Sequence, residues 1–214
     1  MVKLPTATSL TGRFVRLDPV TADDLPALAE ILLEPAVYES GYVMRRRPET
    51  ADQALAAAHE QYLDAPPCDG RGQGRVVFVV RLQADSPLGP AGEVVGTTSL
   101  GEAVLAHERV HLGWTLYRPR VWGSMVNPET KLLLLGHCFD DLGFGRVKIQ
   151  TDALNARSAA AIERLGATRE GVLRRHSRRE DGSFRDTVVF SVIASDWPRV
   201  SAALLARLDP DPQR

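Results

Sequence analysis

The sequence contains little cysteine, very little lysine and no long apolar run. Its 214 residues include two cysteines, Cys68 and Cys138, which are too few for a disulfide framework and lack zinc-finger spacing. The longest uncharged apolar run, Leu132 to Phe139, is far shorter than the roughly 20 residues that span a bilayer. The first 13 residues also lack the apolar stretch of a signal peptide. These absences predict a cytoplasmic protein without membrane segments.

Net charge is also small, because 26 basic and 27 acidic side chains leave a formal charge of −1. A protein that mainly neutralises a polyanion or coats an anionic membrane carries excess positive charge, so we expect neither nucleic acid nor membrane as a partner. Lys3, Lys131 and Lys148 are the lysines, and the other basic residues are arginines. With 44% hydrophobic residues the chain can bury a sizeable core, and residues 1–214 are predicted to form a single α/β domain.

The hydrophobic pattern of the sequence predicts both strands and helices. Period-two alternation or a short apolar run, with flanking turn residues, predicts strands over 12–17, 75–82, 93–100, 110–116, 145–151, 168–176 and 185–194. Apolar stripes at helical spacing predict helices beginning near Thr21 and covering 48–63, 128–142, 155–165 and 195–208. The Thr21 hydroxyl is predicted to cap the first helix, and Pro48 to lie in the first turn of the second.

Residues 107–111 have the sequence HERVH and match the zinc-binding pattern H-E-x-x-H. That pattern needs a helix, which brings both imidazoles to one face. Here the segment runs into the strand predicted over 110–116, and strand residues four positions apart lie about 13 Å from each other. We therefore predict no metal site, although Glu129 stays open as a third ligand and a zinc hydrolase as a less favoured function.

A loop rich in backbone amides precedes the helix predicted over 128–142. Gly123 lets the backbone approach a phosphate closely, and Ser124 offers a hydroxyl donor. Arg118 and Arg120 add positive charge. Because the unpaired amides and the dipole of a helix N-terminus both favour an anion, the loop is a candidate phosphate site.

This loop carries a family resemblance. Arg120, Gly123 and Met125 are similar to the motif Arg/Gln-x-x-Gly-x-Gly/Ala of the GNAT superfamily of acyl-coenzyme A N-acyltransferases. The wider pattern from Glu93 to Trp197 resembles its RimJ/RimL-like branch. Met125 departs from the motif, which has a small residue there, and suggests that the last part of the loop is shaped differently.

The resemblance implies the GNAT fold, a mixed, twisted sheet flanked by helices and splayed open between its fourth and fifth strands, with acetyl-CoA in the gap. The strand over 110–116 would pair with the pantetheine arm and donate an amide to the thioester oxygen. Asn155 would contact the cofactor and also cap its helix. The implied cofactor-binding residues are Leu112, Trp114, Arg118, Arg120, Trp122, Gly123, Ser124, Met125, Val126, Asn127, Asn155 and Ser158.

Amide formation from a thioester needs an amine that has lost a proton. The candidate bases are Glu102, Glu108 and His111. His111 is the first candidate, because its strand would run beside the thioester and imidazole titrates near neutral pH. Glu102, expected just after the strand over 93–100, would reach the amine through water.

The leaving thiolate also needs a proton or stabilisation. Many family members have a tyrosine acid in the helix after the asparagine, but Ile162 is at that position in this sequence. Ser158 is the remaining catalytic candidate, and protonation by solvent is the alternative.

Two segments of opposite charge are candidate binding surfaces for the acceptor and the cofactor. Residues 17–44 contain six acids and no basic residue, and residues 164–179 contain six arginines and one acid. The resemblance places the first helices at the acceptor pocket, where the acidic segment would attract a cationic amine. The basic segment would meet the cofactor's 3′-phosphate or an acidic partner, and both segments are alternatively solvated faces.

We therefore predict an N-acetyltransferase that transfers an acetyl group directly from acetyl-CoA to a primary amine. The acceptor is either a protein N-terminus or a small molecule. A hypothesis from another class is a catalytically silent acyl-CoA-binding sensor or scaffold. Family members often dimerise, so a homodimer is also considered.

Overall fold

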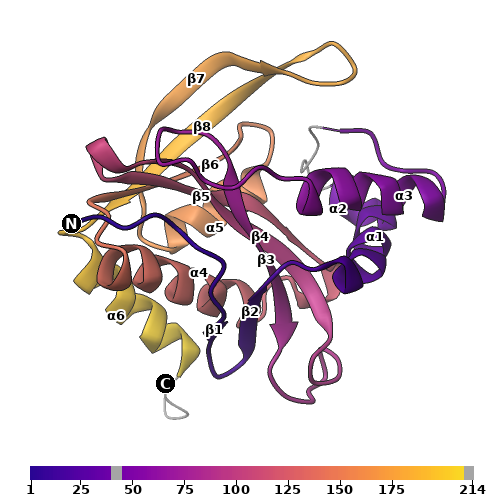
Figure 1. Ribbon diagram of the computed structural model, residues 1–214, viewed down its shortest axis with the longest axis horizontal. Helices are drawn as coiled ribbons and strands as arrows, with labels where there is room; N and C mark the ends of the chain where they lie inside the picture. The colour runs from indigo at the N-terminus through magenta and orange to yellow at the C-terminus, as the bar shows by residue number, and fades with distance from the viewer. Residues whose placement is uncertain (40–44, 210–214) are drawn as a thin grey trace.

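The computed structural model of the chain describes residues 1–39 and 45–209 (Figure 1). An eight-stranded sheet has the order β1-β2-β3-β4-β5-β6-β8-β7, antiparallel throughout except between β5 and β6. The strands are β1 (Leu10–Thr11), β2 (Val15–Pro19), β3 (Arg75–Leu82), β4 (Val94–Val104), β5 (Arg109–Tyr117), β6 (Arg146–Asp152), β7 (Thr168–Arg178) and β8 (Phe184–Ile193). The helices are α1 (Leu25–Leu33), α2 (Pro35–Glu39), α3 (Ala51–Ala58), α4 (Val126–Gly136), α5 (Ala156–Arg164) and α6 (Trp197–Leu208).

Helices pack on both faces of the sheet. Along β3, Phe78 and Val80 point into a core shared with α4 and α6, whereas Val77 and Val79 point into a second core shared with α1 and α3. Successive strand residues face opposite sides, so burial on both sides gives the near-continuous apolar run of this strand. The bounds predicted for it, 75–82, are confirmed. None of the described helices is long and apolar enough to cross a membrane.

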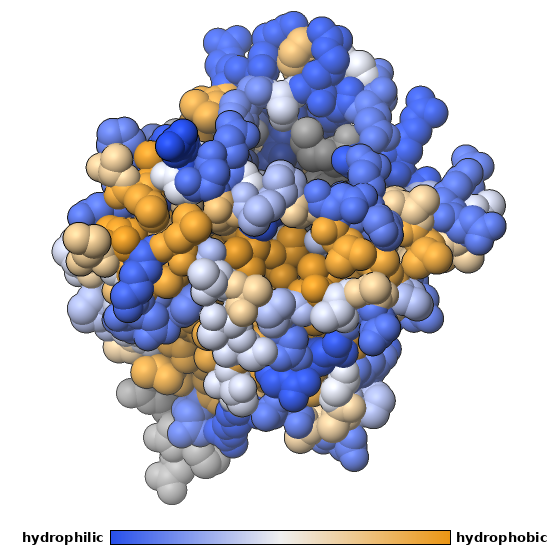
Figure 2. All heavy atoms as spheres, viewed as in Figure 1, coloured by the Kyte–Doolittle hydropathy of each residue, from blue (hydrophilic) through white to orange (hydrophobic). Residues whose placement is uncertain are grey.

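The β7–β8 hairpin projects from the rest of the sheet (Figure 1) and is largely hydrophilic in Figure 2. Most β7 side chains are exposed, in accord with the predicted solvated face. Arg175 and Arg178 lie over the ring of Phe184, and Arg179 pairs with Asp152. Three arginines of the basic segment therefore make contacts within the hairpin or between it and β6.

Several predicted boundaries need correction. The second helix does not begin at Pro48, because the Thr50 hydroxyl accepts from the Gln53 amide at 3.2 Å and caps α3 there. It also ends at Ala58, where a π-helical turn replaces α geometry. α4 begins two residues earlier than predicted and passes into a similar turn after Gly136. β1 and α2 were not predicted, because they are too short to show a period.

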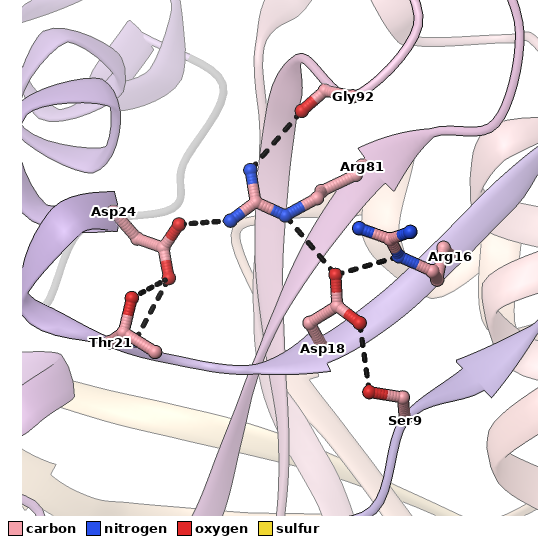
Figure 3. Close-up of polar contacts among 7 residues, drawn as sticks. All are labelled: Ser9, Arg16, Asp18, Thr21, Asp24, Arg81 and Gly92. Atoms are coloured by element: carbon pink, nitrogen blue, oxygen red, sulfur yellow. Dashed lines mark hydrogen bonds and ion pairs between the residues drawn. The ribbon is translucent and has the colours of Figure 1, made fainter.

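The acidic N-terminal segment is paired with arginines. Arg81 of β3 reaches both Asp18 and Asp24 and donates to the Gly92 carbonyl (Figure 3). The Asp24 carboxylate also accepts from the amide and hydroxyl of Thr21, and the two residues form a capping box at the 3-10 turn Ala22–Asp24 that leads into α1, so Thr21 caps this helix start as predicted. The network anchors the start of α1 to the sheet.

Glu129 of α4 fastens the N-terminal turn to the helix layer. Its buried carboxylate accepts the backbone amides of Arg13, Phe14 and Val15 at 2.8, 2.6 and 2.7 Å. A Cβ at Gly12 would lie 2.5 Å from this carboxyl group, so the turn needs glycine there. Glu129 therefore has a structural role, and its place as a third metal ligand is corrected.

We expect Glu129→Ala to lower the free energy of unfolding by about 3 kcal/mol, because three backbone donors lose a charged acceptor. Urea denaturation measures the loss. Glu163→Ala on the exposed side of α5 is the matched control and should change the value by less than about 0.5 kcal/mol. A loss for Glu129→Ala no larger than that of the control would contradict the structural role.

Candidate active site

The site forms where β5 and β6 separate. Their parallel pairing covers three residue pairs and ends at His111 and Lys148, although β5 continues to Tyr117 and β6 to Asp152. Beyond that pair the facing backbone of β5 has no strand partner among residues 1–39 and 45–209, and a cavity of about 1060 Å³ lies there. The sequence predicted this gap between its fourth and fifth expected strands, those over 110–116 and 145–151, which are β5 and β6 here, and the prediction is confirmed.

A bulge in β5 shapes the cavity wall. Ser99 pairs with Gly113 and Thr97 with Leu116, so β5 carries one residue more than β4 between these pairs. Trp114 adopts a left-handed backbone, with φ of 51°. Bulges bend a strand and redirect its side chains. Here the Trp114 ring lines the cavity and lies 4.5 Å from the ring of His111.

The loop before α4 presents an open backbone to the other end of the cavity. Gly123 has a φ of 78°, and no atom lies within 4 Å of the position that a side chain would take. Within the described part of the chain, the amides of Gly123 and Met125 donate to no protein acceptor. Together with the first turn of α4 they are a candidate site for an anion, called here the anion cradle.

Ser124 closes this loop internally. Its hydroxyl donates to the Val121 carbonyl at 2.6 Å and accepts from the Val126 amide at 3.2 Å. Ser124 therefore shapes the cradle, whereas the sequence predicted a hydroxyl donor for a ligand.

His111 is buried, and its charged or aromatic neighbours include Glu102, Lys148 and Trp114. Its Nδ1 lies 3.4 Å from Glu102 Oε2, and the same oxygen accepts from Lys148 Nζ at 2.6 Å. Glu102 belongs to β4, not to a loop after it as predicted, and has a left-handed backbone with φ of 50° at a second bulge. Its side chain is 42% exposed against 4% for His111, and both residues line the cavity.

These neighbours set the charge states. Burial lowers the pKa of His111 despite the opposing effect of Glu102, so the imidazole is neutral at pH 7. His111 and then Lys148 lower the pKa of Glu102 to about 2, so that group stays a carboxylate. The Glu102 carboxylate is therefore a permanent negative charge at the cavity, and the His111 imidazole beside it is a neutral proton acceptor.

The HERVH match lacks the helix that its metal-binding pattern needs. His107 ends a 3-10 turn, Glu108 has a left-handed backbone, and His111 lies in β5 as the alternation predicted. Residues 1–39 and 45–209 contain no group of three His, Cys, Asp or Glu side chains that could hold a metal ion.

Residues 15–168 match the family model described as acetyltransferase (GNAT) domain. The chain belongs to the GNAT acetyltransferase family. A T. thermophilus protein with a provisional acetyltransferase name is 38% identical, with a TM-score of 0.79 and coverage of 98% of this chain and 100% of that one. A GCN5-related N-acetyltransferase from Brucella melitensis is 25% identical, with a TM-score of 0.84 and coverage of 99% and 91%. No curated protein matches in sequence.

Mycobacterium smegmatis RimJ in complex with CoA-disulfide shares the fold, with 20% identity, a TM-score of 0.70 and coverage of 94% of this chain and 95% of that one. The sheet and helices of the present chain are accordingly those of a GNAT fold, as the sequence predicted.

In this GNAT domain most of the predicted cofactor-binding side chains line one cavity. These are Leu112, Trp114, Trp122, Gly123, Ser124, Asn127, Asn155 and Ser158. Met125 and Val126 are not among the lining residues, and the Val126 amide donates to the Ser124 hydroxyl. Asn155 accepts from the Ser158 amide at 2.9 Å and so caps α5, while Ile162 presents an aliphatic side chain to the cavity.

The predicted loop arginines face elsewhere. Arg118 pairs with Glu30 and Glu34 of the α1 region, at 2.7 and 3.4 Å, and Arg120 pairs with Glu93 at 2.6 Å. Neither arginine lines the cavity, and none of the six acids of residues 17–44 does either. The prediction that this acidic segment draws in a cationic amine is therefore corrected for its described part, residues 17–39.

Other cations line the cavity. The Arg157 guanidinium stacks 3.4 Å from the ring of Trp122, and both border the cradle end. Arg164, from the predicted basic segment, also lines the cavity. Arg157 was not predicted, although its place two residues after the predicted cap Asn155 was a usable signal.

Lys148 is expected to hold Glu102 in its carboxylate form. In Lys148→Met the pKa of Glu102 should rise above about 2, because the cation that donates to it is gone. Carboxyl carbon NMR across a pH titration measures the shift, with Glu102→Gln used to assign the signal. The exposed Lys3→Met is the control and should leave that signal unchanged.

Proposed function

We propose that the protein transfers an acetyl group directly from acetyl-CoA to a primary amine. The observation that carries this proposal is the separation of β5 from β6 beyond His111, above a cavity with an anion cradle at one end and the His111–Glu102 pair lining it. Family membership supports the acetyl-transfer chemistry. RimJ, which shares the fold, was solved with a CoA-disulfide.

The chain offers complementary groups for each part of the cofactor. The amides of Gly123 and Met125 and the first turn of α4 suit the pyrophosphate. The unpaired edge of β5, including Leu112 and Trp114, suits the pantetheine arm and a carbonyl oxygen. Arg157, on Trp122, adds a fixed positive charge near the cradle. When bound, acetyl-CoA supplies the acyl group as a thioester.

Glu102 and His111 divide the work on the acceptor amine. The exposed Glu102 carboxylate binds the ammonium form, and its low pKa makes it a weak proton acceptor. The neutral His111 imidazole, whose Nδ1 lies 3.4 Å from Glu102 Oε2, accepts the proton through Glu102 or a water beside it. The leaving thiolate is protonated by solvent or through Ser158, because Ile162 has no acidic proton.

The finer assignments follow the same reasoning. We place the protein in the RimJ/RimL-like branch, with a protein N-terminus or a small amine as acceptor, acting in the cytoplasm and with a homodimer as one assembly. A silent acyl-CoA-binding module is the second candidate function, favoured by Ile162 where many family members have a tyrosine acid.

Thiol release from acetyl-CoA, measured with a panel of peptide N-termini and small amines, tests the proposal. Acceptor-dependent release supports an acetyltransferase. Binding of CoA by calorimetry without release from any acceptor would instead support the silent module. Absence of CoA binding would contradict both.

Replacing the base should affect turnover and spare cofactor binding. We expect His111→Ala to lower kcat by about 10²-fold or more, while the Kd for CoA stays within about twofold. In the unaltered protein kcat/KM should fall as pH drops through the His111 pKa, below 6.5, because the imidazole becomes charged. The exposed His107→Ala is the control. An unchanged pH profile in His111→Ala would exclude this residue as the base.

A negative charge in the cradle should weaken cofactor binding. Gly123→Asp places a carboxylate beside the open amides, and we expect the Kd for CoA to rise about tenfold or more. Gly92→Asp is a matched control, because Gly92 has a similar φ of 80°, equally open space and an exposed position outside the cavity. Equal Kd values for the two variants would contradict the cradle.

A further inference from the structure

We propose that Lys131 is a self-acylation site, whose side-chain amine accepts the acyl group of an acyl-CoA bound in the cavity. The inference rests on the proposed function, since acyl-CoA has to occupy that cavity. It assigns a modification site to a residue that the transfer reaction itself does not use.

Lys131 is held at the wall of the gap. It lies on α4, lines the cavity and is 7% exposed. Its Nζ donates to the Thr115 hydroxyl at 2.9 Å, and Thr115 lies in the part of β5 that has no partner in β6. The Thr115 hydroxyl is fixed in turn by Thr98 at 2.8 Å. The amine therefore faces the same stretch of β5 that suits the pantetheine arm and the acyl group.

Lys131 differs from the other two lysines in its partners. Lys148 is bound to the Glu102 carboxylate, and the exposed Lys3 donates to the Asp141 carbonyl at 3.1 Å. Among the described residues no carboxylate forms an ion pair with Lys131. The titratable side chains of β4, β5 and β6 that line the cavity are Glu102, His111, Tyr117 and Asp152. Glu102 is engaged by Lys148 and His111, and Asp152 pairs with Arg179.

Burial without an ionic partner changes the protonation state. It lowers the pKa of Lys131 to about 7, so about half of the amines are uncharged at neutral pH. An exposed lysine with a pKa near 10.4 is uncharged in fewer than about one molecule in a thousand at that pH. Because the uncharged amine is the nucleophile, a large share of Lys131 is in the reactive form at neutral pH.

The step is balanced with acyl-CoA as the sole co-reactant. Nζ forms a bond to the thioester carbonyl carbon, the carbon–sulfur bond breaks, and the CoA thiolate leaves with the proton that Nζ loses. The product is a neutral amide that keeps one N–H for Thr115. A buried position that was costly for an ammonium then holds no charge.

The experiment uses the full chain incubated with acetyl-CoA and no acceptor. Intact mass and peptide mapping should show one acetyl group on Lys131 in the unaltered protein and in Lys3→Met, and none at that position in Lys131→Met or Lys131→Arg. The initial rate should increase about tenfold between pH 6 and pH 8, following the uncharged fraction of an amine with a pKa of about 7. Excess CoA should suppress the labelling of Lys131 and leave any labelling of Lys3 unchanged.

The outcomes separate this inference from the proposed function. Calorimetric CoA binding and acceptor-dependent thiol release with Lys131 unmodified would overturn self-acylation alone. Labelling of Lys131 that excess CoA does not suppress would also overturn it, because the reaction would not pass through the bound thioester. Absence of both CoA binding and labelling would remove the proposed function as well. Circular dichroism of Lys131→Met and Lys131→Arg establishes that each variant is folded.

Discussion

The parallel pairing of β5 with β6 stops after three residue pairs, and the functional surfaces of the molecule depend on where it stops. β6 remains antiparallel to β8 along its full length, and β5 remains paired with β4 through its bulge. Each strand therefore has a strong partner on its outer side, which satisfies the backbone there. The gap between them is held open by hydrogen bonding on both flanks, so a ligand finds an unpaired strand edge already in place.

The roles of the charged side chains depend on their partners and their burial, which the overall composition does not show. In this near-neutral chain most acids of the N-terminal segment pair with arginines. Arg81 ties the start of α1 to the sheet (Figure 3), and Arg118 ties α1 to the loop before α4. At the cavity, contacts with His111 and Lys148 keep Glu102 a carboxylate, whereas burial lowers the pKa of His111 and leaves the imidazole neutral at pH 7. Both groups are shifted by their surroundings in directions that suit ammonium binding and proton acceptance.

The sequence predicted elements well where one local pattern decides them. The bounds of β3 followed from its apolar run, and the position of His111 in a strand followed from alternation. Patterns could not show which distant acid each arginine meets, so Arg118 was expected at the cofactor. Lys131 was not predicted to matter because it adjoins four leucines on α4, and its depth depends on the fold of β5. Non-local contacts therefore set the parts of the site that periodicity missed.

The Glu129 carboxylate has a consequence for the order of folding during synthesis. The amides that it accepts belong to residues 114 to 116 positions earlier in the chain. At roughly 5–20 residues per second, a ribosome needs on the order of ten seconds to make that intervening stretch. The turn between β1 and β2 therefore leaves the ribosome well before α4, and its amides gain their carboxylate acceptor only once α4 has been made.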